Sequence, residues 1–281
     1  MKYWVESSNA GGLVNQADAQ VSIFDHGFTV GDGIFETLKT NFGKPFALDR
    51  HLDRLMRSAQ LLELTTPSVE KIEQAIFAVL NQAEISETEF GRLRVTVTAG
   101  RSELGSLRSN DWTLVVAWSQ ARAWPESCVL TISDVVRNER SALASAKTTS
   151  YAENALALHR AKKLGADEAV VLNLAGNVSE ATGSNVFIVT NGVVKTPPLS
   201  DGCLGGITRE LVLEWMPTDI QLEVGSITPA ELLAADEVFV TSSTRDIQAV
   251  RQIDNVGFKC PAPITSRLQT VFAANASKEM S

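Results

Sequence analysis

The sequence has few cysteines and histidines, the residues that form disulfides and most zinc sites. Its 281 residues include three cysteines, Cys128, Cys203 and Cys260, which are odd in number and far apart. Cysteines in this arrangement are not typical of a disulfide-rich domain, and they lack the close pairs of a zinc site. The three histidines also lack metal-ligand spacing. We therefore expect no metal centre and no disulfide framework.

Basic charge and long apolar runs are missing too. Asp and Glu outnumber Lys and Arg by 33 to 25, which gives a formal net charge of −8 and argues against a surface for nucleic acids or anionic membranes. No apolar run approaches the roughly 20 residues that span a bilayer. The opening MKYWVESSNAGG lacks the apolar stretch of a signal peptide. These absences predict a cytoplasmic protein with no nucleic-acid or membrane partner.

The common nucleotide-binding motifs are absent as well. There is no G-x-G-x-x-G after a strand and no Walker A sequence. Strands outnumber long helices in both halves without a regular strand–helix–strand repeat, which disfavours a Rossmann sheet or a TIM barrel. The length favours two domains, and the polar, proline-containing segment 119–127 is the best linker between them.

The sequence does contain short periodic segments that predict regular elements. A stripe of leucine and alanine predicts a helix over 50–62. Asn191-Gly192 predicts a hairpin turn. Alternating or continuous apolar residues predict strands at 92–100, 113–118, 168–173, 185–190 and 237–243, and a further helix is expected at 208–215.

Lys147 is the only charged residue in the segment 141–152, SALASAKTTSYA. A lone ammonium is costly to bury, and lysine is the side chain that desolvation most readily turns into a nucleophilic amine. A lysine in a dry pocket at this position suits Schiff-base chemistry. The alternative is a lysine whose stem packs on apolar surface while its head reaches water.

Arg54 indicates a binding site for an anion. Its neighbours three and four residues away on the predicted helix are Arg50, His51, Arg57 and Ser58. None of them is a carboxylate, so a local ion pair does not account for this cluster of positive groups. An external anion would account for it, and a solvated basic face is the alternative.

Two other segments also suit an anion. In SDGCLGGITREL (200–211), two glycines allow close approach of the backbone, and Ile207 and Thr208 open a helix whose free N–H groups face outward. The hydroxyls of Ser243 and Thr244 follow a strand end and could donate to phosphate oxygens. A capped glycine turn and a capped next segment are the plain alternatives.

Glu180 and Tyr151 complete the candidate set. Glu180 lies between two apolar strands, so it is either at a bend in solvent or buried with a partner. If buried, it could hold a proton on a heterocyclic nitrogen, and Tyr151 could donate to a phenolate oxygen. An amine, a carboxylate and three loci for one phosphate are the parts that pyridoxal 5′-phosphate needs.

These residues lie in motifs that resemble the class IV aminotransferases, the fold type IV pyridoxal-phosphate enzymes. The resemblance covers nearly the whole chain and implies an α/β (α+β) fold of two domains, with the cofactor at the domain interface and usually a homodimer. The implied boundaries are a small domain at 1–117, a linker at 118–124 and a large cofactor-binding domain at 125–281. The matching segments are DHGFTVGDGIFETLK (25–39), HLDRL (51–55), KTTSYAENALA (147–157), GADEAVVLNLAGNVSEATGSNVFIV (165–189), GGITREL and ADEVFVTSSTRDI.

The resemblance implies a role for each candidate. Lys147 would form the internal aldimine and move the Cα proton of an amino substrate. Glu180 would pair with the pyridine nitrogen, and Tyr151 would approach the ring oxygen. The phosphate would be held by Arg54, by the backbone N–H groups of Ile207 and Thr208, and by Ser243 and Thr244.

Fewer residues bear on which member of the family this is. D-amino acid aminotransferases carry an Arg-x-His pair in a loop that reads AGRSELGSLRSN here and has no histidine, and Phe35 replaces their tyrosine. Branched-chain aminotransferases are longer and carry a Gly-Thr-Ala-Ala loop where this chain has SSTR. They share an arginine aligned with Arg94, our candidate to hold a substrate carboxylate.

Bacterial 4-amino-4-deoxychorismate lyases resemble the chain in three respects. These are the length, the segment VTAGRSELG and Asn154 after the lysine. We therefore expect a lyase that forms 4-aminobenzoate and pyruvate. A branched-chain or D-amino acid aminotransferase is the alternative, and a protein that binds the cofactor without catalysis is a third.

Overall fold

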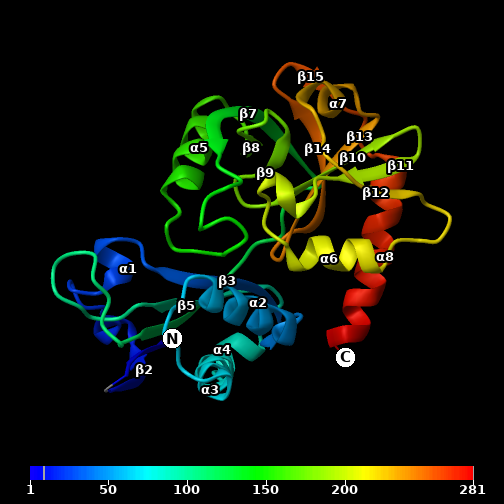
Figure 1. Ribbon diagram of the computed structural model, residues 1–281. Helices are drawn as coiled ribbons and strands as arrows, with labels where there is room; N and C mark the ends of the chain where they lie inside the picture. Colours follow the sequence, from blue (N-terminus) through cyan, green and yellow to red (C-terminus); the bar gives the residue numbers. More distant parts are fainter. Residues whose placement is uncertain (9, 281) are drawn as a thin grey trace. The chain divides into compact units, whose positions relative to one another are not determined.

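The computed structural model describes residues 1–8 and 10–280, and these form two compact units. Unit 1 combines Met1–Ala123 with Ala146–Tyr151, and unit 2 combines Trp124–Ser145 with Ala152–Glu279. Figure 1 shows the sheet and the helices of each unit. Within the described residues, no helix is both long and apolar enough to cross a membrane.

Unit 1 is built on an antiparallel sheet. Strand β3 is largely buried and pairs with β5 from Gly33–Thr98 to Thr40–Gly91. Within the described residues the six strands lie in the order β2 (Gly11–Asn15), β1 (Lys2–Ser7), β6 (Thr113–Gln120), β5 (Gly91–Thr98), β3 (Gly33–Asn41) and β4 (Lys44–Pro45).

Two helices cover the sheet of unit 1. Helix α2 packs on β3, and α3 packs on β1 and β6 (Figure 1). The predicted stripe of α2 is buried at Leu52, Leu55 and Ala59, because these side chains join the core formed by the strands. The helices are α1 (His26–Thr29), α2 (Leu48–Leu61), α3 (Val69–Leu80) and α4 (Ala83–Ser86), with the 3-10 turn η1 (Gln16–Asp18).

The segment 146–151 reaches unit 1 from the middle of the chain. The Lys147 carbonyl accepts a hydrogen bond from Phe35 N at 2.9 Å, and Thr149 N donates to the Gly33 carbonyl at 2.8 Å. Lys147 N donates to Ser58 Oγ at 3.2 Å. These bonds fix the backbone of Lys147 beside β3 and α2.

Two of the expected domain boundaries need correction. Residues 118–120 are not linker, because β6 continues to Gln120 in register with β5. Residues 146–151 group with unit 1, not with the domain expected at 125–281, because they bond to β3 and α2.

Unit 2 contains a larger, mixed sheet. Strand β7 pairs in parallel with both β14 and β8, whereas the hairpins on either side are antiparallel. Within the described residues the order is β12 (Leu222–Val224), β11 (Val193–Thr196), β10 (Asn185–Thr190), β13 (Glu237–Ser242), β14 (Asp246–Ile253), β7 (Ser127–Arg137), β8 (Glu168–Asn173) and β9 (Val178–Ala181), with β15 (Val256–Gly257) on β14.

The helices of unit 2 flank this sheet (Figure 1). Helix α5 packs on β7 and β8, and α6 contacts β13. The strands predicted at 168–173 and 185–190 are confirmed at both ends. The expected α/β (α+β) fold is confirmed. The helical elements are α5 (Ala152–Lys163), η2 (Leu199–Asp201), α6 (Ile207–Glu214), α7 (Pro229–Ala234) and α8 (Pro263–Met280).

Candidate active site

Lys147 lies beside an aromatic ring in unit 1. Its Nζ is 4.5 Å from the centroid of the buried Phe35 ring. The Arg94 guanidinium lies 3.7 Å from the same centroid, and Tyr151 meets the ring edge-on at 5.5 Å. Three of the predicted residues therefore surround Phe35, which strand β3 places next to the Lys147 amine.

Arg94 has few other contacts. It is exposed, and among the described residues its one hydrogen bond runs from Nε to Thr96 Oγ1 at 3.3 Å. A guanidinium presents five N–H donors in a planar fork that matches a carboxylate. The position of Arg94 near Lys147 therefore suits the carboxylate of a substrate.

Arg54 is buried and is paired with a carboxylate that the sequence argument missed. Its Nε donates to Glu36 Oε1 at 2.8 Å and its Nη2 donates to Glu36 Oε2 at 2.7 Å. The neighbours of Arg54 along the helix include no carboxylate, whereas Glu36 comes from β3. The signal was a lone carboxylate inside the apolar strand segment GIFETLK, where burial requires a partner.

His51 completes this buried cluster. Its Nδ1 lies 2.7 Å from Glu36 Oε2. Burial lowers the pKa of His51, and the charges of Arg54 and Lys147 lower it further, although Glu36 opposes them. The imidazole is therefore neutral at pH 7. Because its partner only accepts, its proton is on Nδ1, which donates to Glu36.

Glu36 remains ionised despite its burial. Burial alone raises the pKa of a carboxyl group, but the charge of Arg54 and hydrogen bonds from Arg54 and His51 outweigh burial and hold the pKa of Glu36 at about 2. The cluster is thus an ion pair with a neutral histidine. The ion pair holds the side chain of Arg54 through two hydrogen bonds.

Glu180 lies on β9 of unit 2 with a donor on each oxygen. Its Oε2 accepts from Leu204 N at 2.9 Å, and its Oε1 accepts from Arg137 Nη2 at 3.1 Å. The side chain is 12% exposed. A partly buried carboxylate oriented in this way suits a hydrogen bond from a protonated ring nitrogen.

Asn154 belongs to the same network. The Arg137 guanidinium donates to Asn154 Oδ1 at 3.2 Å, and Asn154 Nδ2 donates to the Thr182 carbonyl at 2.9 Å. The side chain predicted to contact substrate is buried and connects Arg137 to the turn after β9. Arg137 was not among the predicted residues, because no local sequence motif marks it.

The start of α6 has the features of an anion site. Ile207 and Thr208 open the helix, and its N-cap Gly206 has no side chain to satisfy the free N–H groups. The hydroxyl of Thr208 is buried without a hydrogen-bond partner. A Cβ on Gly206 would lie 2.0 Å from Asn185 Oδ1, so a larger residue there would force the Asn185 side chain to move. This site fits the phosphate of the expected cofactor.

Ser243 and Thr244 lie in the turn between β13 and β14. The next residue, Arg245, forms a buried ion pair with Glu168 of β8. Glu168 Oε2 also accepts from Ser184 Oγ at 2.9 Å. Glu168 and Arg245, which the sequence analysis did not identify, therefore tie the hydroxyl turn to the turn at 182–184.

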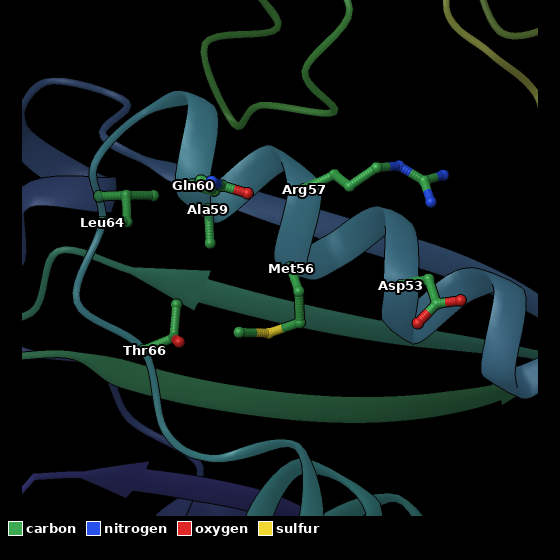
Figure 2. Close-up of a pocket in the computed structure, with 7 residues that line it drawn as sticks. All are labelled: Asp53, Met56, Arg57, Ala59, Gln60, Leu64 and Thr66. Carbon is green, nitrogen blue, oxygen red and sulfur yellow. The ribbon is translucent and has the colours of Figure 1, made fainter.

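The other candidate features carry no comparable chemistry. Burial raises the pKa of Cys128 and of Cys203 to about 12, which keeps both thiols protonated. Among the described residues no group of His, Cys, Asp and Glu could hold a metal ion. Figure 2 shows a surface hollow that contains none of the predicted residues; it is lined by Asp53, Met56, Arg57, Ala59, Gln60, Leu64 and Thr66.

Comparison with known proteins identifies the family. The family model for amino-transferase class IV matches residues 33–253. A putative branched-chain-amino-acid aminotransferase of Methanocaldococcus jannaschii is 33% identical over 93% of each chain. The aminodeoxychorismate lyase of Bacillus subtilis is 30% identical, over 93% of this chain and 92% of the lyase.

The fold leads to the same family. The crystal structure of the branched-chain aminotransferase of Thermoproteus uzoniensis with norvaline is 28% identical and superposes with a TM-score of 0.89, over 99% of this chain and 96% of that one. The chain belongs to the class IV aminotransferases, whose cofactor is pyridoxal 5′-phosphate.

Proposed function

We propose that this protein is an aminotransferase that acts on apolar α-amino acids. The observation that carries the proposal is the group around Phe35: the Lys147 amine at 4.5 Å and the Arg94 guanidinium at 3.7 Å from one ring. The amine would bind the cofactor and the guanidinium would bind a carboxylate. The apolar side chain of the substrate is suggested by the branched-chain aminotransferases among the relatives.

The relatives support an aminotransferase more than the sequence argument did. The resemblance implies that branched-chain aminotransferases are longer than this chain. The archaeal relative is covered over 93% of its length and is thus nearly as short. Length therefore no longer favours the lyase.

The lyase remains the second candidate. The Bacillus subtilis lyase is similar over nearly the same span, and a lyase substrate also carries carboxylates that Arg94 could bind. A D-amino acid enzyme is less well supported. The loop expected to trap its substrate has no histidine, and its Arg108 donates to Asp32 at 2.6 and 2.7 Å.

Each predicted residue would have its own role in the reaction. Pyridoxal phosphate supplies an electron-withdrawing ring that makes the Cα proton acidic. Lys147 would move that proton as a general acid and base, and Glu180 would keep the ring nitrogen protonated. Arg54, Ile207, Thr208, Ser243 and Thr244 would hold the phosphate, and Tyr151 would donate to the ring oxygen.

A side-by-side assay tests the proposal. The purified protein is given L-leucine or D-alanine with 2-oxoglutarate, and separately 4-amino-4-deoxychorismate. Formation of the oxo acid from L-leucine supports the aminotransferase. Release of 4-aminobenzoate and pyruvate without amino transfer would establish the lyase instead. An unchanged cofactor spectrum with every substrate would indicate a protein that binds the cofactor without catalysis.

We also propose that the protein is a homodimer. Unit 1 exposes large apolar side chains at Ile23, Phe28, Leu104 and Leu107, each at least two-thirds accessible. Ser102 N donates to the Phe24 carbonyl, which holds the two segments together. Exposed apolar groups gathered in this way favour association. Light scattering should give twice the chain mass of 30.3 kDa; the mass of one chain would contradict the proposal.

Arg54 gives a direct test of the phosphate site. Arg54→Ala should weaken the binding of pyridoxal phosphate by about 1.5–3 kcal/mol, or roughly ten- to a hundredfold. Arg54→Lys should recover only part of this loss, because one ammonium cannot replace a bidentate fork. A cofactor titration of the apoprotein measures this change. Arg57→Lys is the matched control, since Arg57 is exposed on the same helix (Figure 2). If Arg54→Ala and Arg54→Lys bind pyridoxal phosphate as tightly as Arg57→Lys and wild type do, the ion pair of Arg54 with Glu36 has only a structural role.

A further inference from the structure

The buried carboxylate of Glu36 is unexpected next to an arginine that is proposed to bind phosphate. A carboxylate repels a phosphate group and neutralises the guanidinium that should attract it. Burying such an ion pair is also costly, and an apolar pair of similar volume often serves stability as well. Glu36 therefore requires a function beyond stabilising the fold.

The geometry points to that function. Glu36 accepts from Nε and Nη2 of Arg54, which are the donors of one edge of the planar guanidinium. Fixing two atoms of a rigid plane fixes the direction of all its N–H groups. The orientation of the Arg54 fork is thus set before a ligand arrives.

His51 fixes the carboxylate in turn. Its Nδ1–H donates to Oε2, the same oxygen that accepts from Arg54 Nη2. The two oxygens of Glu36 therefore face three donors. A glutamine cannot satisfy this arrangement, because its NH₂ group would face an N–H donor in either orientation of the amide.

The helix that carries Arg54 is also hydrogen-bonded to the backbone of Lys147. Arg54 and Ser58 lie four residues apart on α2 and so share a face of the helix. Ser58 Oγ accepts from Lys147 N at 3.2 Å. Fixing the guanidinium on α2 therefore sets its direction relative to the backbone that carries the amine.

We propose that Glu36 is a positioning residue that, with His51, orients the Arg54 guanidinium for the phosphate of the cofactor. The inference rests on the proposed function, because it assigns the phosphate to Arg54. It predicts that Glu36 affects ligands with a phosphate group and leaves those without one unaffected.

The test compares pyridoxal 5′-phosphate with pyridoxal, which lacks the phosphate. Glu36→Gln apoprotein should bind pyridoxal phosphate about ten- to a hundredfold more weakly than wild type, since a misdirected fork loses hydrogen bonds to a charged group. Pyridoxal should bind equally well to both. Glu36→Asp, which keeps the carboxylate, should recover part of the loss. Asp49→Asn, an exposed carboxylate at the start of α2, should change neither affinity.

A second pair of variants tests whether Glu36 acts through Arg54. In an Arg54→Lys background, adding Glu36→Gln should weaken pyridoxal phosphate binding by less than about twofold, because there is no fork left to orient. If Glu36→Gln does not fold, His51→Leu removes one donor to the same carboxylate. His51→Leu should weaken pyridoxal phosphate binding by about three- to tenfold, again without affecting pyridoxal.

Different results would contradict the positioning role of Glu36 and the phosphate-binding role of Arg54. If Arg54→Lys lowers the affinity for pyridoxal phosphate but neither Glu36→Gln nor His51→Leu does, the inference is wrong and the phosphate site stands. An equal loss for both ligands would show a general structural role for Glu36 and would also overturn it. If Arg54→Lys binds pyridoxal phosphate as wild type does, the phosphate role of Arg54 fails first.

Discussion

Lys147→Ala should lose essentially all turnover, a reduction of at least about 10⁴-fold, because the same amine would link the cofactor and transfer the proton. The variant should still fold. Its backbone keeps the hydrogen bonds to Ser58 and from Phe35, which do not involve the side chain. Steady-state assays give the loss of kcat, and the absorption spectrum should show cofactor that is bound but not covalently attached.

Borohydride identifies the lysine independently of turnover. Reduction of the loaded wild-type protein should attach the cofactor to the peptide that contains Lys147. Lys163→Ala, an exposed lysine of α5, serves as the control and should keep wild-type turnover. Attachment to another lysine, or normal turnover in Lys147→Ala, would refute the assignment.

The elements with strong local patterns were predictable from the sequence. The strands at 168–173 and 185–190 are largely continuous apolar runs bounded by turn residues, so both ends of each strand were predicted correctly. Candidate residues could be proposed from the sequence, because the chemistry of a lone lysine or a bracketed carboxylate is visible locally. The family resemblance then assigned their roles.

The partners of these residues were not predictable, because they come from distant parts of the chain. Arg54 pairs with Glu36 and Glu180 with Arg137, and these pairs are separated by 18 and 43 residues. A helical pattern reports only neighbours three or four residues away. The absence of a local carboxylate therefore left two interpretations of Arg54, an external anion or a solvated basic face, and gave no sign of Glu36.

The grouping of Lys147 with unit 1 is also a tertiary effect. The segment 146–151 has no apolar period that would assign it to a sheet. It joins β3 through backbone bonds such as Thr149 N to the Gly33 carbonyl. Main-chain hydrogen bonds do not depend on residue type, so the composition of the segment gave no sign of its partner.

Glu180→Gln should lower kcat by about 10²–10³-fold while KM changes little, the range seen when one stabilising group is removed from a transition state. An amide carries no charge to stabilise a protonated ring nitrogen. It also replaces one of the two oxygens that accept from Leu204 N and Arg137 Nη2. Steady-state kinetics with a saturating cofactor concentration measure the loss. Glu153→Gln, an exposed carboxylate at the start of α5, should leave kcat unchanged.

A cofactor analogue with carbon in place of the ring nitrogen decides whether Glu180 acts on that atom. If Glu180 stabilises the protonated nitrogen, wild type and Glu180→Gln should turn over at similar low rates with this analogue. The interaction between Glu180 and the ring nitrogen is then missing in both proteins, so the substitution has no further effect on kcat. If Glu180 instead only supports Arg137 and the backbone at Leu204, Glu180→Gln should lower kcat by the same factor with either cofactor. That result, obtained with correctly bound cofactor, would mean that Glu180 is not the ring partner.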